Sequence, residues 1–208
     1  MSDITLHDAI FTQRAMRRLL PDPVSDEDIR YVIEAATRAP SAANGQQWAF
    51  IAVRDAALRK EIGALYLEIA ARLVKPASEG GASLDEASRK VYGHAWRFAE
   101  RIGDAPVHII ACMRHGVAGD DDASRESSYY GSIFPAVQNL MLAARSRGLG
   151  TVLTTLHLAE EPRFKKILAI PDKVQTVALI PLGYPDAGWK QPLRGDVDEV
   201  IHWDGWRG

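Results

Sequence analysis

Two short segments of the chain stand out among the residues that could do chemistry. Residues 13–18 read Q-R-A-M-R-R and would place Arg14, Arg17 and Arg18 within one helical turn, a pattern that on its own is typical of a solvated basic face. Residues 39–48 read A-P-S-A-A-N-G-Q-Q-W and are rich in small and amide-bearing side chains. This loop is either a plain turn or a ligand loop, because Asn44 and Gln46 offer donor–acceptor pairs that suit a uracil-like edge.

Searches for other catalytic and binding motifs give negative results. The chain contains no nucleotide-triphosphate loop, no dinucleotide fingerprint, no G-x-S-x-G and no H-E-x-x-H, so we expect no metal site. Gly148 and Gly150 precede a predicted strand, which favours a helix end and turn over phosphate binding. The acidic run at 120–122 lacks a cation-loop ligand series, and we interpret it as a solvated loop. The single cysteine, Cys112, lies in an apolar run and is predicted to be a core residue.

Length and composition predict one ordinary soluble domain that spans residues 1–208. Apolar residues make up 47% and charged residues 25%, which excludes disordered and coiled-coil classes. The net charge of −2 is unfavourable for binding a nucleic-acid backbone. No apolar run approaches the length of a membrane helix, and the first residues lack the apolar core of a secretory signal. We therefore expect a cytoplasmic protein with no nucleic-acid or membrane partner.

Apolar spacing predicts four long helices. Ser25 and Asp55 are predicted to cap the first two, and a third is expected over about 83–102. The fourth carries apolar residues from Ile133 to Ala144 and ends at Gly148. Tyr66, Tyr92, Trp96 and Phe98 lie on the second and third helices. We interpret them mainly as core residues, with a roof over a substrate channel as the alternative.

Four β-strands are predicted over 48–54, 107–113, 151–155 and 176–182, since these runs are short and rich in β-branched residues. Their irregular alternation with helices indicates an α+β fold rather than repeated βαβ units. The run at 107–113 is apolar throughout and is predicted to be central.

The end of the chain is unusually rich in tryptophan. Trp189, Trp203 and Trp206 fall within the last 20 residues, among Gly, Asp and Arg. Exposing large aromatic rings to water is unfavourable, so this segment is expected to dock either on its own core or on a partner.

Taken together, the order of these motifs resembles the nitroreductase family of FMN-dependent oxidoreductases. The family's R-R-S-x-R segment corresponds to Gln13–Arg17 here, and its A-P-S-x-x-N-x-Q-P-W segment to residues 39–48. P-A-V-Q-N-L at 135–140, G-L-G-T at 148–151 and G-Y-P at 183–185 followed by Arg194 resemble later family blocks. The resemblance spans nearly the whole chain. It implies a central, mainly antiparallel sheet flanked by helices, in an intertwined homodimer that holds FMN at the subunit interface.

The resemblance also implies which residues bind FMN. Arg14, Ala15 and Arg17 belong to the segment that contacts the phosphate and the ribityl–pyrimidine side, and Arg194 would return to the phosphate. The predicted residues along the flavin itself are Pro40, Ser41, Ala42, Asn44, Gln46, Leu153, Thr154 and Thr155. The chain departs from the family pattern at three positions, where Gln13, Ala15 and Gln47 replace the more usual arginine, serine and proline.

The function implied is hydride transfer from NAD(P)H to a flat, electron-poor acceptor such as a nitroaromatic or quinone, with ping-pong kinetics. The flavin carries this chemistry, which is why the protein needs no nucleophile or general base of its own. Arg17 is the candidate for stabilising negative charge on the reduced flavin. The alternatives are a superfamily relative that dehalogenates a substrate or fragments the flavin, and a non-catalytic FMN carrier or sensor.

Overall fold

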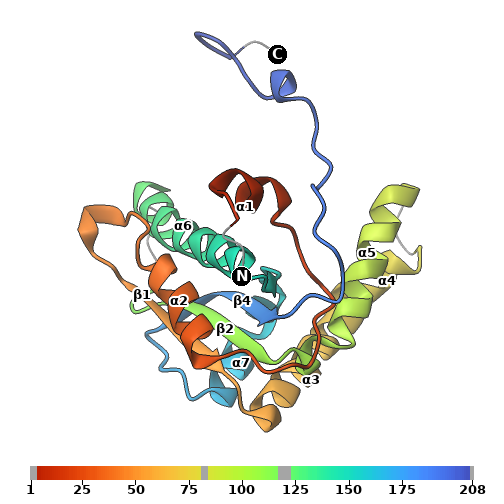
Figure 1. The fold of residues 1–208 in the computed structure, drawn as a ribbon. Coiled ribbons are helices and arrows are strands. Elements are labelled where there is room, and N and C mark those ends of the chain that lie inside the picture. The colour runs from red at the N-terminus through yellow and green to blue at the C-terminus, as the bar shows by residue number, and fades with distance from the viewer. Residues whose placement is uncertain (1–3, 81–83, 117–122, 207–208) are drawn as a thin grey trace.

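The structure is a computed structural model, and it describes residues 4–80, 84–116 and 123–206. Figure 1 shows a sheet flanked by helices, with an extended C-terminal segment that projects from the body. The acidic run at 120–122 lies outside the described residues. The α-helices are α1 (Leu6–Thr12), α2 (Asp26–Ala36), α3 (Ala56–Leu73), α4 (Lys75–Ser78), α5 (Glu86–Ala99), α6 (Ala123–Ser146) and α7 (Glu161–Ile167). The strands are β1 (Trp48–Val53), β2 (Val107–Met113), β3 (Gly150–Thr151) and β4 (Gln175–Gly183).

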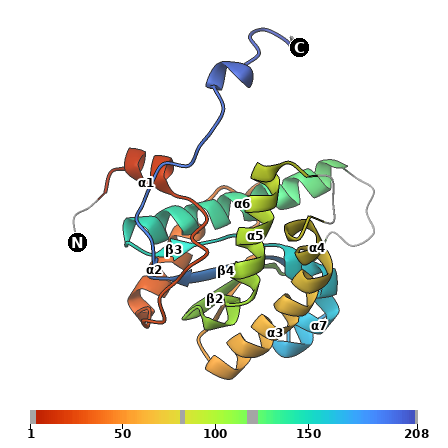
Figure 2. The ribbon, with the colours of Figure 1, turned by 90° about the vertical axis from the view of Figure 1, so that its right-hand side faces the viewer.

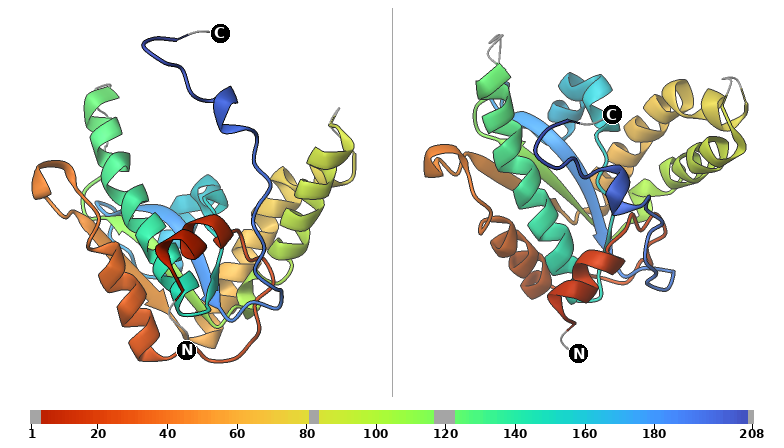
Figure 3. Two further views of the ribbon diagram at one scale, coloured as in Figure 1. Left: turned by 45° about the horizontal axis from the view of Figure 1, so that its top comes forward. Right: turned by 90° about the horizontal axis from the view of Figure 1, so that it is seen from above.

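The strand order is β1-β2-β4-β3, and all three pairings are antiparallel. Every residue of β2 is buried, which confirms its predicted central position. Its alternate residues enter two different cores, as the two-residue period of a strand requires. Ile109 and Ala111 face the side covered by α2 and α6, whereas Ile110 and Cys112 face the side covered by α3, α5 and α7. Figure 3 shows the sheet between these two groups of helices. The predicted α+β fold is confirmed.

The predicted strand at 151–155 is wrong in its extent. β3 contains only Gly150 and Thr151, and the pairing with β4 resumes as a single bridge between Thr154 and Leu179. The pairs 150–183, 151–182 and 154–179 share one antiparallel register, and this register places residue 152 opposite Pro181. Proline has no N–H to donate, so the ladder is interrupted at that point.

The helix ends follow the predicted caps. The Ser25 hydroxyl accepts from the Asp28 N–H, and the Asp55 carboxylate accepts from the Leu58 N–H. Helix α5 begins at Glu86, later than predicted, and α6 begins ten residues before its apolar pattern does. Gly148 takes φ +72° just after α6, which confirms the predicted helix end.

In the part of the chain that the structure describes, no helix has the length and apolar character to cross a membrane.

Two buried histidines lie in the cores without full hydrogen bonding. His108 Nε2 is 2.8 Å from the Ile102 carbonyl oxygen, while its Nδ1 has no partner among the described residues. Neither ring nitrogen of His157 has a partner there, and its ring packs on Phe164 at 4.6 Å between centroids. Burial lowers the pKa of each imidazole from 6.5 to about 4, because a charged ring would be poorly solvated.

We expect the free energy of unfolding to fall as the pH drops from 6.5 to 4. In this window the unfolded chain protonates both histidines and the folded chain does not, so acid favours unfolding. Each histidine contributes a slope of at most about 1.4 kcal/mol per pH unit. Urea unfolding at several pH values measures this slope. His157→Leu should reduce this slope, and an unchanged slope in that variant would contradict the assignment.

Candidate functional site

Residues 13–18, which we call the arginine segment, are extended rather than helical. The expected placement of Arg14, Arg17 and Arg18 within one helical turn is therefore wrong. After α1 the chain leaves the helix at Gln13, with ψ 127°, and runs alongside the sheet. The Met16 N–H donates to the Thr151 carbonyl at 2.8 Å, and the Leu20 N–H donates to the Tyr184 carbonyl at 2.8 Å. These long-range bonds override the local helical preference and fix the segment against β3 and the end of β4.

Gly150 allows this segment to lie close to the sheet. A Cβ built on Gly150 would stand 2.9 Å from Met16 Cβ and 3.1 Å from Leu19 Cδ2. Any larger residue would push the segment outward, and Arg17 with it. The glycine therefore has a packing role at the site, which its place after a helix end did not reveal.

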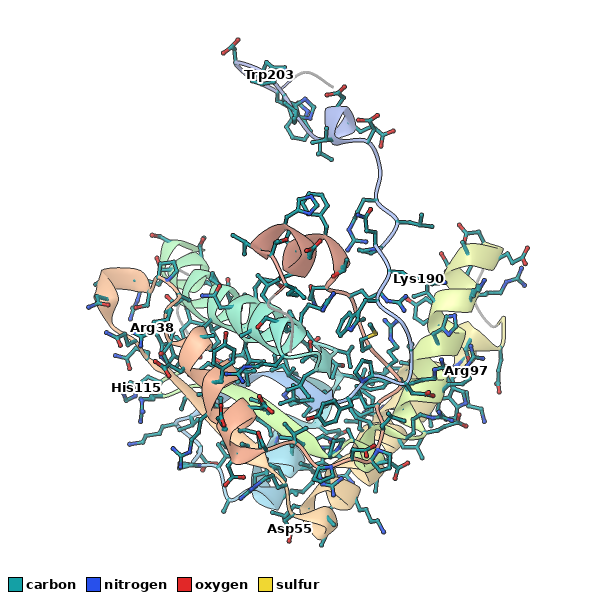
Figure 4. All side chains as sticks on the ribbon, viewed as in Figure 1. Arg38, Asp55, Arg97, His115, Lys190 and Trp203 are labelled. Atoms are coloured by element: carbon teal, nitrogen blue, oxygen red, sulfur yellow. The ribbon has the colours of Figure 1, made fainter. Side chains whose placement is uncertain are left out.

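A cavity of about 530 Å³ lies between the arginine segment, α5 and the start of the C-terminal segment. Its lining contains four arginines and a histidine but no carboxylate, and consists of Arg14, Ala15, Met16, Arg17, Arg18, His94, Arg97 and Ala187. We call it the arginine cavity. Figure 4 shows the labelled Arg97 on α5, on the opposite flank from Arg38. Such a lining favours an anionic ligand.

Two arginines of this cavity have donor groups that the described residues do not satisfy. Arg14 Nη2 donates to the Gly188 carbonyl at 3.0 Å, but its buried Nε has no partner there. No hydrogen bond or ion pair joins Arg17 to another residue in the described ranges, although its charge acts on neighbours. Burial lowers the pKa of His94, and the charges of Arg97 and Arg17 lower it further. The arginine cavity therefore carries positive charge and contains hydrogen-bond donors that the described residues leave without an acceptor.

Thr154, a predicted flavin-binding residue, is joined to Tyr66 on α3, and the charge of Arg17 acts on that tyrosine. The Tyr66 hydroxyl and Thr154 Oγ1 are 2.8 Å apart. Burial raises the pKa of the Tyr66 phenol, and the bond to Thr154 and the charge of Arg17 only partly oppose this. Tyr66 belongs to the core, as expected, but sequence spacing could not show that its hydroxyl reaches a predicted site residue.

The second predicted segment forms an exposed loop around a short 3-10 helix, Ala42–Asn44. The Gln46 side-chain amide donates to Asn44 Oδ1 at 3.1 Å, and the Ala42 N–H donates to Ser132 Oγ at 3.0 Å. Ala43, Asn44 and Gln46 have φ values of 51°, 53° and 48°, which are unfavourable for residues with side chains. Strain of this kind is a feature of ligand-binding loops.

The two predicted halves of the site do not meet within one chain. Ser132 anchors the 41–46 loop to α6, while Arg145 of the same helix bonds to Thr12, next to the arginine segment, at 2.9 Å. Thirteen residues separate these anchors, which is about 20 Å along the helix axis. Figure 1 shows the loop and α5 on opposite flanks of the molecule. No residue of 40–46 lines the arginine cavity.

Arg194 lies in the projecting C-terminal segment, where its guanidinium donates to the Leu193 carbonyl at 2.7 Å. Among the described residues no contact joins it to Arg14 or Arg17, so its convergence with them stays a prediction. In the same part of the chain, His, Cys, Asp and Glu side chains form no group of three or more that could hold a metal ion.

Comparison with known proteins shows that the chain is similar to members of one family. The model of the nitroreductase family matches residues 10–184. An NADH dehydrogenase of Thermus thermophilus is 28% identical over 212 residues, covering 94% of each chain. The iodotyrosine deiodinase 1 of Rattus norvegicus is 29% identical over 94% of this chain and 68% of its own length.

A solved structure supports the fold. The crystal structure of oxidised iodotyrosine deiodinase bound to FMN and 3-iodo-L-tyrosine superimposes with a TM-score of 0.78 at 21% identity, covering 97% of this chain and all of that one. The resemblance based on the arginine and 39–48 segments is therefore confirmed at the level of family and fold. This chain belongs to the nitroreductase family and is an oxidoreductase of the flavin-dependent type.

Proposed function

We propose that this protein is an FMN-dependent oxidoreductase that takes hydride from NAD(P)H and reduces a flat, electron-poor acceptor of the nitroaromatic or quinone type. The observation that carries the proposal is the arginine cavity, in which the buried Nε of Arg14 has no hydrogen-bond partner among the described residues. Family membership supports the reaction class, and the names of the relatives support a nicotinamide donor.

The residues present fit FMN. Its phosphate would lie against Arg14, whose buried Nε lacks an acceptor, and Arg194 would join it there. Leu153, Thr154 and Thr155 would border the ring system. When bound, FMN would supply the two-electron chemistry between donor and acceptor. Arg17 would hold a positive charge near the pyrimidine side and stabilise the anionic reduced form.

A second copy of the chain would complete the site. Pro40, Ser41, Ala42, Asn44 and Gln46 are too far from Arg14 and Arg17 in one chain, and in a homodimer they would come from the partner. The exposed loop and the projecting C-terminal segment both support this arrangement. We therefore propose that FMN is bound at the interface of a homodimer.

Reductive dehalogenation is the second candidate, because a deiodinase is among the relatives and a deiodinase structure shares the fold. The arginine cavity is assigned to FMN, so its lining does not discriminate between these acceptors. Relatives named NADH dehydrogenase and NAD(P)H nitroreductase support reduction of a nitroaromatic or quinone as the first choice. Flavin fragmentation and a carrier or sensor role are the remaining alternatives.

Absorption spectra of the purified protein test the proposal. We expect a yellow protein that bleaches on anaerobic addition of NADPH or NADH and regains its colour with a nitroaromatic or quinone. A yellow protein that neither nucleotide bleaches would favour a carrier, and a colourless protein that FMN does not reconstitute would refute the proposal. Product analysis with a halogenated phenol and of the flavin itself would identify dehalogenation or fragmentation.

A further inference from the structure

The hydroxyl groups of Tyr66 and Thr154 form a pair whose hydrogen-bond directions follow from the geometry. Both groups are held rigidly. Tyr66 is 6% exposed on α3, and its ring meets the Phe98 ring edge-on with centroids 5.9 Å apart. The Thr154 backbone exchanges two hydrogen bonds with Leu179 of β4, at 3.0 and 2.9 Å.

Hydrogen-bond satisfaction favours the phenol as the donor in this pair. Burial raises the pKa of Tyr66, so the hydroxyl keeps its proton at neutral pH. A buried O–H needs an acceptor, and among the described residues Thr154 Oγ1 is the one within hydrogen-bond distance. The reverse direction, from Thr154 to Tyr66, would leave the buried phenol proton without an acceptor among the described residues, which is unfavourable.

Thr154 Oγ1 accepts a second hydrogen bond. The Leu156 N–H points at the same oxygen from 3.4 Å, a long contact that occupies its remaining lone pair. A threonine hydroxyl has two lone pairs and one proton. With both lone pairs engaged, that proton is directed away from Tyr66 and Leu156. Thr154 is only partly buried as a residue, which is compatible with a ligand beside it.

We propose that Tyr66 is a positioning residue that turns the Thr154 hydroxyl into a dedicated hydrogen-bond donor toward an acceptor atom of the flavin ring. The inference rests on the proposed function, because it takes Thr154 to border FMN. Without the phenol, the threonine hydroxyl could rotate and point its proton elsewhere. Tyr66 would thus affect flavin binding without touching the flavin, and only through Thr154.

A double-mutant cycle tests this dependence. The variants are Tyr66→Phe, Thr154→Val and the double variant, and the measurement is FMN dissociation from purified holoprotein, followed by flavin fluorescence on dilution. Losing one net hydrogen bond should weaken FMN binding about 2- to 10-fold in each single variant. We expect the double variant to equal Thr154→Val, because the phenol has nothing left to orient. Flavin reduction potentials should show the same non-additive pattern.

Two controls separate this role from general packing. Tyr129→Phe removes another partly buried phenol hydroxyl, which bonds to Gln175 at 3.1 Å, and should leave FMN binding unchanged. Thr154→Ser keeps the hydroxyl and should bind FMN nearly as the parent does. The inference is overturned if Tyr66→Phe weakens binding equally with and without Thr154, or if neither single variant changes it. A parent protein that binds no FMN would instead refute the proposed function.

Discussion

Replacing Arg14 with alanine should weaken FMN binding about 10- to 150-fold, because a hydrogen bond to a charged group contributes about 1.5–3 kcal/mol. The guanidinium has a buried Nε that no residue in the described part of the chain satisfies, and it lies in a cavity lined by three further arginines. The predicted ligand of this donor is the FMN phosphate. Riboflavin lacks that group, so it should bind poorly to the parent and about equally poorly to Arg14→Ala.

Variants of three other arginines test whether the effect of Arg14→Ala is specific to the FMN phosphate. Arg194→Ala should behave like Arg14→Ala if the C-terminal segment brings it to the phosphate. Arg17→Ala should also weaken riboflavin, lower the flavin reduction potential and slow hydride transfer, because Arg17 is assigned to the ring. Arg89→Ala, on α5 but outside the cavity lining, is the control. Flavin titrations with both ligands measure these effects, and an equal loss of FMN and riboflavin in Arg14→Ala would show that the residue supports only the fold.

The elements that could be predicted from the sequence are those whose determinants are local. Ser25 and Asp55 cap their helices with their own side chains, and the apolar run of β2 has few alternatives to a central strand. The extended arginine segment depends instead on Thr151, and the break in β3 on Pro181 of a different strand. Neither can be deduced from the segment concerned.

The candidate site residues stay predictions that rest on the resemblance, and their arrangement in space could not be deduced from the sequence. The family motifs name Arg14, Asn44 and Thr154, and the structure places Arg14 and Arg17 in the lining of one cavity. Residue types alone cannot show that the 41–46 loop and Arg14 lie at different parts of α6. Nor can spacing reveal the bond between Tyr66 and Thr154, which are 88 residues apart.

The tryptophan-rich end of the chain was expected to dock either on its own core or on a partner. The structure excludes the first outcome for two of its three tryptophan rings. Trp189 packs under Arg145, with the guanidinium carbon 4.1 Å from the ring centre. Trp203 and Trp206, however, are 72% and 86% exposed, so they do not dock on the core of their own chain. Figures 1 and 2 both show the segment leaving the body. Other apolar side chains are exposed along it, namely Leu193, Val197, Val200 and Ile201. We therefore propose that this segment docks on a partner subunit.

Truncation after Gly195 should therefore convert a dimer into monomers or aggregates and release FMN. Each tryptophan buried on a partner contributes on the order of 3 kcal/mol or more, by analogy with core tryptophans. Light scattering after size exclusion measures the mass, and absorbance measures the bound flavin. Truncation after Gly205 removes Trp206 but keeps Trp203, so it should dissociate less of the dimer and release less FMN. If the chain ending at Gly195 stays dimeric and yellow, the segment is not part of the interface, and the exposed rings need another explanation.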